Sequence, residues 1–359
     1  MSEVINIGLD DGHSSIKVFL GLNVTDEPIQ IQMLSRAKIG ENRNLNLINN
    51  NNDDATIVIE TESGVEKFWV SENHQRDIID TRSKDYPYSN LNLALVNQAL
   101  RKVRTFFNGS NQLKIVAGLP ANQFYDKNIG HINHELVQKK VDSLKRLAKS
   151  YAESEEDLPR LEAVAVKIIP EGYGILTDLM YDNDLQETEF SESVSEYGCV
   201  VIDIGGRTVD VVSISSGNKE PIGMLSFDKG VLYLREKIKS KLTERLNLTQ
   251  SPNDNLLDKA IETNWYGKQG SKSGVEVSQI LSEAYDEHVR EIYSDIKDIL
   301  GSNEAFGGVI ISGGGAILLG EKMKDIVEEH HPNIDVYVPN ESQFSNARGF
   351  WKLTYLLDF

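Results

Sequence analysis

The chain has 359 residues, of which 40% are hydrophobic, and its formal net charge at pH 7 is −18. This length exceeds the size at which a single hydrophobic core usually stops growing, so we expect two domains. A surface this acidic argues against direct, sequence-independent binding of DNA, because a protein that neutralises phosphates needs Lys and Arg. The single cysteine, Cys199, excludes a disulfide within the chain, and the apolar runs have strand length, too short to span a membrane. Since the start of the chain also lacks a basic, apolar leader, we expect a bacterial-type cytoplasmic protein.

Periodicity and turn residues predict the elements of the first half. In chain order these are a hairpin over residues 4–22, strands at 29–34, 55–59 and 65–70, a helix at 91–107, a strand at 114–119, a helix at 129–152, a strand at 164–169 and a helix at 173–180. Residues 39–54 are rich in Asn and predict an exposed loop. The acidic stretch 181–196 predicts a solvated connector between the two halves.

The second half repeats this plan. It contains a hairpin at 199–215, a strand at 222–227, a helix at 230–246, a mixed insertion at 250–300 that ends in a helix at 277–300, a strand at 309–312, a helix at 316–330 and a strand at 335–338. The order βββαβα therefore occurs twice. We infer an α/β fold of two related domains, residues 1–195 plus 340–359 and residues 196–339, with variable insertions at about 35–90 and 245–300.

Two segments far apart in the chain share one pattern, IGLDDGHSSIKV at 7–18 and VIDIGGRTVDV at 201–211. In each, a β-branched run ends in an Asp, a Gly-containing tight turn follows, and a second apolar run returns, which predicts a β-hairpin with a carboxylate near its tip. The backbone N–H groups of such a turn can bind phosphate oxygens, and the Asp can hold the hydrated Mg²⁺ that accompanies ATP. Two such turns predict a clamp that closes on a nucleotide from both sides.

Five further segments complete a resemblance to a known group of proteins. They are VIISGGGA at 309–316, IVAGLP at 115–120, FYDKN at 124–128, VKIIPE at 166–171 and NARGFW at 346–351. With the two turns, the chain resembles the superfamily of actin, sugar kinases and DnaK-type chaperones, and within it the plasmid-segregation actins of the ParM (StbA) family. The resemblance implies an α/β actin-like fold in which each domain has a mixed five-stranded sheet flanked by helices, with the nucleotide cleft between the domains.

The resemblance also implies the cofactors, which are ATP, with GTP as the alternative, and Mg²⁺. Asp10 and Asp203 would hold the metal ion through water, although an Asp-Asp-Gly sequence is also an ordinary turn. Lys17 would reach the β- and γ-phosphates; the alternative is a strand lysine that points to solvent. His13 and Arg207 depart from the small polar residues that the family has at these positions. The His13 imidazole could still donate to phosphate, and Arg207 either contacts phosphate or points outward. The nucleotide-binding candidates are Asp10, Gly12, His13, Ser14, Ser15, Lys17, Gly205, Gly206, Arg207, Thr208, Gly313, Gly314 and Gly315, with Arg235 and Lys239 on the side of the ribose and adenine.

Two carboxylates are the catalytic candidates. Glu171 follows the strand at 164–169, at the sheet edge where α/β proteins place their sites, and the resemblance makes it the residue that orients or deprotonates the hydrolytic water. The alternative is a first-turn Glu that the helix dipole favours. Asp203 follows a buried-looking apolar run, where an unpaired carboxylate would be costly, and a cation site explains it better. We expect Asp203 to organise the Mg²⁺ and the attacking water.

The function implied by the resemblance is an ATPase that forms helical filaments with copies of itself. Its assembly and hydrolysis-triggered disassembly would segregate plasmid DNA through a small adaptor protein bound to a plasmid centromere, with no contact between this chain and DNA or membrane. A metabolite kinase is the alternative, and it requires a general-base Asp facing a substrate pocket. The closing helix at 345–357 carries five apolar residues, Phe350, Trp351, Leu353, Leu356 and Leu357, so we expect the adaptor to insert a helix beside it. The alternative is that all five pack into the first domain.

Overall fold

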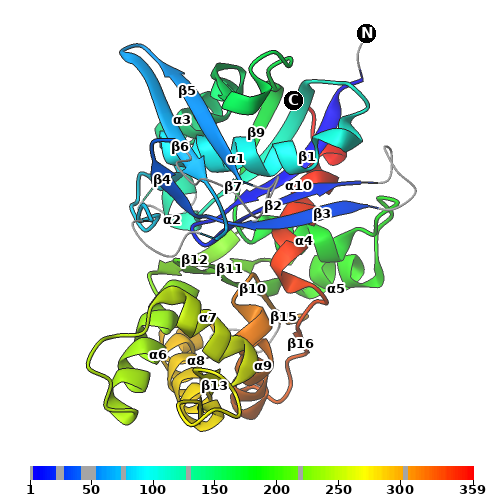
Figure 1. Ribbon diagram of the computed structural model, residues 1–359. Coiled ribbons are helices and arrows are strands. Elements are labelled where there is room, and N and C mark those ends of the chain that lie inside the picture. The colour runs from blue at the N-terminus through cyan, green and yellow to red at the C-terminus, as the bar shows by residue number, and fades with distance from the viewer. Residues whose placement is uncertain are drawn as a thin grey trace.

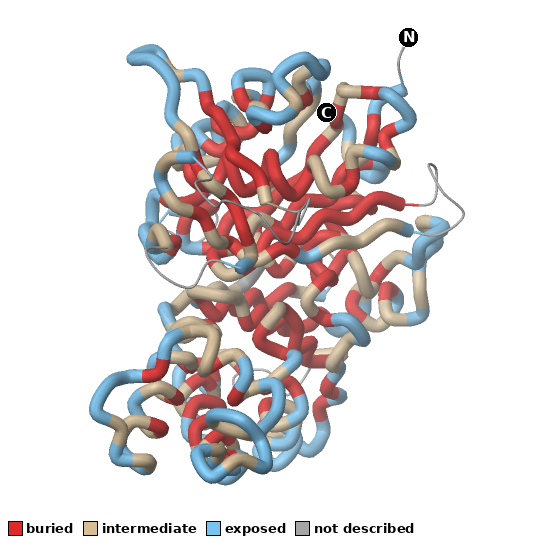
Figure 2. The backbone as a smooth tube through the Cα atoms, in the orientation of Figure 1, coloured by how far each residue is buried: buried red, intermediate tan, exposed pale blue. Residues whose placement is uncertain are grey.

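The computed structural model describes residues 3–21, 28–41, 54–73, 78–126, 131–216, 221–301 and 306–359, and the side chains of 221 and 222 are not described. The chain forms two α/β halves, stacked one above the other in Figure 1, each built on a five-stranded mixed sheet. Most of the loop predicted at 39–54 lies outside the described residues. Figure 2 shows that the buried backbone concentrates in the two sheets and at the boundary between the halves.

The first sheet has the order β3 (Ile29–Leu34), β2 (Ser15–Leu20), β1 (Ile5–Asp11), β7 (Gln112–Leu119) and β9 (Glu162–Pro170). One face carries Ile7 and Leu9 of β1 and packs against α1 (Asn90–Lys102) and α3 (His134–Lys145). A small sheet of β4 (Ala37–Ile39), β6 (Gly64–Val70), β5 (Ala55–Thr61) and β8 (Ser150–Ala152) extends this half. The other face is covered by α10 (Ser345–Leu356), which approaches so closely that a Cβ on Gly8 would lie 1.9 Å from the Ala347 carbonyl oxygen.

The second sheet repeats the first, in the order β12 (Pro221–Phe227), β11 (Val209–Ile214), β10 (Cys199–Ile204), β15 (Val309–Ser312) and β16 (Val336–Tyr337). One face buries α6 (Val231–Arg245), α8 (Ser278–Gly301) and α9 (Ala316–His330), with α7 (Asp254–Thr263) beside them. The other face packs against α4 (Tyr173–Met180) and α5 (Glu189–Tyr197). In both sheets the first strand lies between the second and the fourth, so the predicted duplication of a five-stranded mixed sheet is confirmed.

Three sequence-based predictions are wrong. The helix predicted at 129–152 ends at Lys145, and Ser150–Ala152 instead forms β8, because the small sheet offers an edge on β5 to which these residues pair. The acidic connector predicted at 181–196 contains helix α5, whose Glu residues face solvent while Val194 packs under the second sheet. The helix predicted at 91–107 ends at Lys102 and continues as a short 3₁₀ helix over Arg104–Phe107.

The closing helix α10 lies at the boundary between the halves, where Figure 1 shows it in red beside α4. Gly349 permits this contact, because a Cβ there would lie 1.7 Å from the Gly174 carbonyl oxygen. Phe350 is fully buried and Trp351 is 4% exposed, which is the alternative of packing in the core for these two residues, whereas an adaptor helix beside α10 stays a prediction. They fill the space that glycines on β1, β7 and α4 leave open. None of the helices in the described ranges is long and apolar enough to cross a membrane.

Candidate functional site

The two predicted hairpins place four charged side chains at equivalent positions of the duplicated sheets. In the first hairpin Asp10 lies directly opposite Lys17, and the Lys17 Nζ donates to Asp10 Oδ2 at 2.7 Å. In the second hairpin Asp203 lies directly opposite Asp210. All four residues are buried, and Lys17 therefore is not a solvent-facing strand lysine. The first hairpin is neutralised internally, whereas the second brings two like charges together, an arrangement that destabilises a strand pair.

The charge imbalance appears in the pKa values. Burial, together with the neighbouring Asp10 and Asp210, raises the pKa of Asp203 to about 7. Burial also raises the pKa of Asp210, although the Thr208 Oγ1 donates to its Oδ2 at 2.6 Å. Burial would lower the pKa of Lys17, but Asp10 beside it outweighs that effect and raises the value. The ionised carboxylates of the second hairpin therefore need a positive partner that the hairpin does not supply.

Glu171 joins this group from the end of β9. Its backbone N–H donates to the Leu119 carbonyl at 2.8 Å, and its pKa is raised well above the usual value by burial and by the carboxylates of Asp210 and Asp203. A carboxyl whose pKa is raised by burial and by like charges is typical of catalytic sites, because it can hold or accept a proton near neutral pH. Its role at the hydrolytic water stays a prediction.

The donor set fits a hydrated divalent cation better than a directly ligated one. Within the described residues, no group of three or more His, Cys, Asp or Glu side chains is arranged to hold a metal ion directly. Asp11 forms a buried ion pair with Lys140, and Lys17 pairs with Asp10, whereas Asp203, Asp210 and Glu171 have no such ion pair with another described residue. Mg²⁺ keeps several of its waters and binds through one or two carboxylates plus phosphates. Asp203, with Asp10 on the facing turn, matches that pattern.

A cleft of about 590 Å³ opens beside these carboxylates, between the two halves. On the side of the first half it is lined by the turn between β1 and β2, including Ser14, and by Lys17 of β2. On the side of the second half it is lined by α6 and α7 and by the glycine turn before α9. The predicted residues that line the cleft are His13, Ser14, Ser15, Lys17, Gly206, Arg235, Lys239, Gly314 and Gly315. Residues of both halves that the sequence predicts for the nucleotide site therefore line one cavity.

The turns themselves meet at the floor of the cleft. A Cβ on Gly206 would lie 2.5 Å from the Ser14 Oγ, so a side chain at this position would separate the two turns. Gly313 has φ +88°, and a Cβ there would lie 2.2 Å from the Asp203 Oδ1. The carbonyls of Gly205 and Gly206 accept from the first N–H groups of α6 at 3.0 and 2.8 Å. Only glycine permits the backbone to come this close to a carboxylate and to a facing turn.

Several predicted residues take places that the sequence did not indicate. His13 is buried, its Nδ1 lies 2.5 Å from the Thr81 carbonyl oxygen, and burial lowers its pKa to about 4, so it is a neutral ring. Arg207 pairs with Asp228 at 3.1 Å instead of turning into the cleft. Lys239 lies 3.0 Å from Asp254 of α7. The predicted residues that lie beside the cleft without lining it are Asp10, Gly12, Glu171, Asp203, Gly205, Arg207, Thr208 and Gly313.

The structure adds two contacts that the sequence did not single out. Asn346 of α10 donates through Nδ2 to the Asp203 Oδ2 at 2.6 Å. Arg36, which follows β3 in the first half, donates to Asp258 of α7 at 2.9 Å, and Asp258 also pairs with Arg235 of α6. The second contact joins the two halves across the cleft. Neither pair is marked by sequence spacing, because its members come from elements more than a hundred residues apart.

Comparison with known proteins identifies the architecture. The structure of Ta0583, an archaeal actin homolog in complex with ADP, superposes with a TM-score of 0.71 over 99% of this chain and 100% of that chain, at 20% sequence identity. The ParM of a 15-stranded filament from Clostridium botulinum superposes with a TM-score of 0.71 over 99% and 100%, at 19% identity. The chain has the actin-like fold.

Sequence comparison finds a closer but shorter likeness. A family model described as "Archaeal actin homologue MreB-like, C-terminal" matches residues 201–325. An archaeal actin homolog of Thermoplasma volcanium is 30% identical over 158 residues, which is 43% of this chain and 45% of that protein. The match therefore spans less than half the length of that relative. The segment recognised by the family model begins within β10, two residues before Asp203, and includes the glycine turn at 313–315.

Proposed function

We propose that this chain is an ATPase that assembles with copies of itself into actin-like filaments, with Mg²⁺ as the metal cofactor. The observation that carries the proposal is the convergence of two equivalent turns, one from each sheet, on a single cleft, with a buried Asp beside each turn. Phosphate groups need convergent N–H donors and a cation, and both turns are built for close backbone approach. ADP in the complex of Ta0583, which shares the fold, supports an adenine nucleotide as the ligand.

Different residues of the chain would have different roles in phosphoryl transfer to water. The two turns would bind the phosphates, and Lys17 would place its ammonium group against the developing charge. Asp10 and Asp203 would hold the hydrated Mg²⁺, which supplies charge neutralisation between the phosphates when it is bound. Glu171 would orient the attacking water and hold its proton. Phosphoryl transfer depends mainly on positioning and charge stabilisation, so this set is sufficient.

For the biological role we propose plasmid DNA segregation, with a small adaptor protein between the filament and the centromere. The likeness to a ParM filament across the whole chain supports this role, and the net charge of −18 supports an adaptor instead of direct DNA contact. The partial sequence match to archaeal actin homologs favours a second candidate, an archaeal actin-type filament with no plasmid. A metabolite kinase remains the alternative outside the filament proteins. The predicted bacterial, cytoplasmic setting stays a prediction.

Light scattering together with phosphate release tests the filament proposal. Adding MgATP to micromolar protein should raise the scattering and release phosphate without any added metabolite. A kinase would give no scattering and no free phosphate, because it transfers the phosphoryl group to its metabolite, and it would form ADP only once that metabolite was supplied. For the role in segregation, centromere DNA should pellet with the filaments only when the adaptor is present. DNA that pellets with purified filaments alone at physiological salt would contradict the adaptor proposal.

A further inference from the structure

Asn346 has a buried side-chain amide that bonds to Asp203 on one side and to the peptide after Glu171 on the other. It is 4% exposed and lies in the first turn of α10. Its Nδ2 donates to Asp203 Oδ2 at 2.6 Å, and its Oδ1 accepts from the Gly172 N–H at 3.4 Å. These partners fix which end of the amide is which, because an ionised carboxylate only accepts and a backbone N–H only donates. Asp203 belongs to the second sheet, and Gly172 follows Glu171 directly.

The surroundings leave the Asp203 carboxylate little freedom. Its Oδ1 faces the backbone of Gly313, where a Cβ would lie 2.2 Å away, and its Oδ2 is bonded to Asn346. The carboxylates of Asp10 and Asp210 repel its ionised form. A charge-assisted hydrogen bond is roughly twice as strong as a neutral one, so the amide both orients the carboxylate and favours its charged state.

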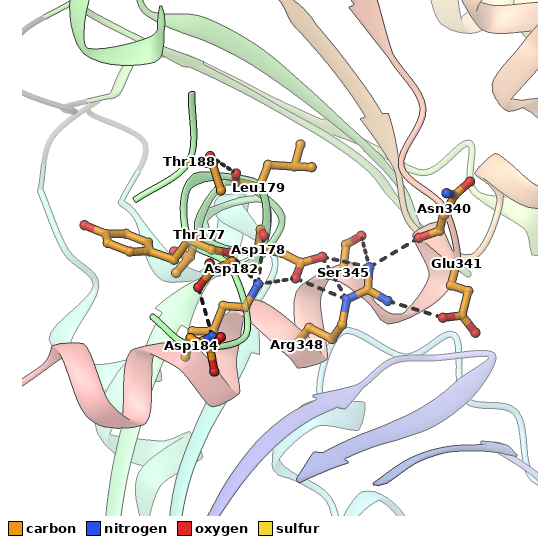
Figure 3. A network of polar contacts seen from close by, with 12 residues as sticks. Thr177, Asp178, Leu179, Asp182, Asp184, Thr188, Asn340, Glu341, Ser345 and Arg348 are labelled. Atoms are coloured by element: carbon orange, nitrogen blue, oxygen red, sulfur yellow. Dashed lines mark hydrogen bonds and ion pairs between the residues drawn. The ribbon is translucent and has the colours of Figure 1, made fainter. Parts of the chain in front are cut away.

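The helix that carries Asn346 is anchored by a second polar group, shown in Figure 3. Arg348 donates to both carboxylate oxygens of Asp178 in α4, with distances of 2.8 to 3.1 Å. Lys352, one turn further on, donates at 2.8 Å to the same carboxylate and at 2.7 Å to the Tyr181 carbonyl. The side chains of Asp178 and Lys352 are 5% and 3% exposed. Since α4 begins directly after Gly172, this anchor fixes α10 relative to the peptide beside Glu171.

We propose that Asn346 is a positioning residue, which holds the Asp203 carboxylate in the orientation that binds hydrated Mg²⁺. Through its bond to the Gly172 N–H, it also fixes the position of Asp203 relative to Glu171. The inference rests on the proposed function, since it assigns a task within the proposed nucleotide site. The C-terminal helix is then part of the site: its first turn reaches the metal side of the cleft, and its next two turns hold it in place. A purely structural bridge in the core is the competing explanation.

Nucleotide affinity with and without Mg²⁺ separates the two explanations. We would titrate a fluorescent ATP analogue into nucleotide-free protein, once in MgCl₂ and once in EDTA, for the wild type and for Asn346→Ala. The matched control is Asn97→Ala, which removes another buried amide that joins two elements, here through bonds to Ser150 at 2.9 and 3.3 Å. Thermal unfolding of each variant reports its structural cost. Asn346→Ser, which is too short to reach Asp203, provides a second variant if the alanine variant does not fold.

The positioning role predicts that Asn346→Ala weakens binding about tenfold in Mg²⁺, the factor expected from one charge-assisted hydrogen bond, and by less than about twofold in EDTA. Asn97→Ala should lower the melting temperature without changing the ratio of the two affinities. If the ratio of the affinities in Mg²⁺ and in EDTA is the same for Asn346→Ala as for the wild type, the positioning role is overturned while the proposed function stays intact. A wild type that does not bind the analogue, or binds it equally well without Mg²⁺, would overturn the proposed function and this inference with it.

Discussion

Replacing Asp203 with Asn should stabilise the nucleotide-free protein, an unusual outcome for a buried residue at a candidate active site. The substitution removes the charge but keeps the size of the side chain and an oxygen that accepts from Asn346. Burial and the neighbours Asp10 and Asp210 raise the pKa of Asp203 from 3.8 to about 7. A difference of about three pKa units corresponds to roughly 4 kcal/mol of destabilisation once the group is ionised in both states.

The direction of the pH dependence follows from proton binding. Between pH 4 and pH 7 the folded state holds the Asp203 proton more tightly than the unfolded state, so stability falls as the pH rises through this window. At pH 8 nearly the whole penalty is present, and at pH 5 less than half of it remains. Asp203→Asn removes the penalty at both values, and its advantage over the wild type should therefore be about 2 kcal/mol larger at pH 8.

Thermal unfolding in EDTA at pH 5 and pH 8 measures this difference. Since about 1 kcal/mol shifts the melting temperature of a domain this size by about 2–4 °C, the two pH values should differ by several degrees. Asp178→Asn is the control, because its carboxylate is equally buried but pairs with Arg348 and Lys352, and its loss should destabilise the protein at both pH values. A lower melting temperature for Asp203→Asn at pH 8, or a gain that does not change with pH, would refute the reasoning.

The other predictions concern the nucleotide cycle. Glu171→Ala should assemble with ATP but release phosphate more slowly, so that its filaments persist; phosphate release at the wild-type rate would remove Glu171 from the mechanism. Asp10→Ala should weaken MgATP binding in isothermal titration, because the turn loses a carboxylate for the hydrated metal ion and Lys17 loses its partner; unchanged affinity here and in Asp203→Ala would contradict the cleft assignment. Arg36→Ala should speed the release of labelled ADP by up to about fivefold, the worth of one partly exposed ion pair across the cleft, and an unchanged stopped-flow rate would show that the pair with Asp258 does not restrain opening.

The sequence predicts the fold well because the two hairpins carry strong local signals. Strand, Asp, glycine turn and returning strand recur at 7–18 and 201–211, and the structure pairs Asp10 with Lys17 and Asp203 with Asp210 at equivalent positions. The element order then fixes which strands are central. Helix α5 was missed because its charged residues dominate the composition of 181–196, whereas the few apolar side chains that dock it become evident only when the second sheet is in place.

The site is less predictable than the fold, because its polar partners come from distant parts of the chain. The place of His13 in the turn suggests a donor to phosphate, yet its Nδ1 lies 2.5 Å from the Thr81 carbonyl oxygen. Arg207 follows two glycines, but a carboxylate 21 residues away, Asp228, holds it. The contact of Asn346 with Asp203 spans 143 residues and depends on how closely α10 lies against β1. No spacing rule reports such contacts.

Electron microscopy of the purified protein with nucleotide is the direct test of filament formation. Samples would contain MgATP, MgADP, or ATP with EDTA, at equal protein concentration. We expect filaments with MgATP, and filaments that shorten as phosphate is released. We also expect few or no filaments when Mg²⁺ is removed, because the phosphates then meet the carboxyl groups of Asp203, Asp210 and Glu171 with no cation between them. Single particles in all three samples, with ATP bound in the MgATP sample, would contradict a filament-forming ATPase.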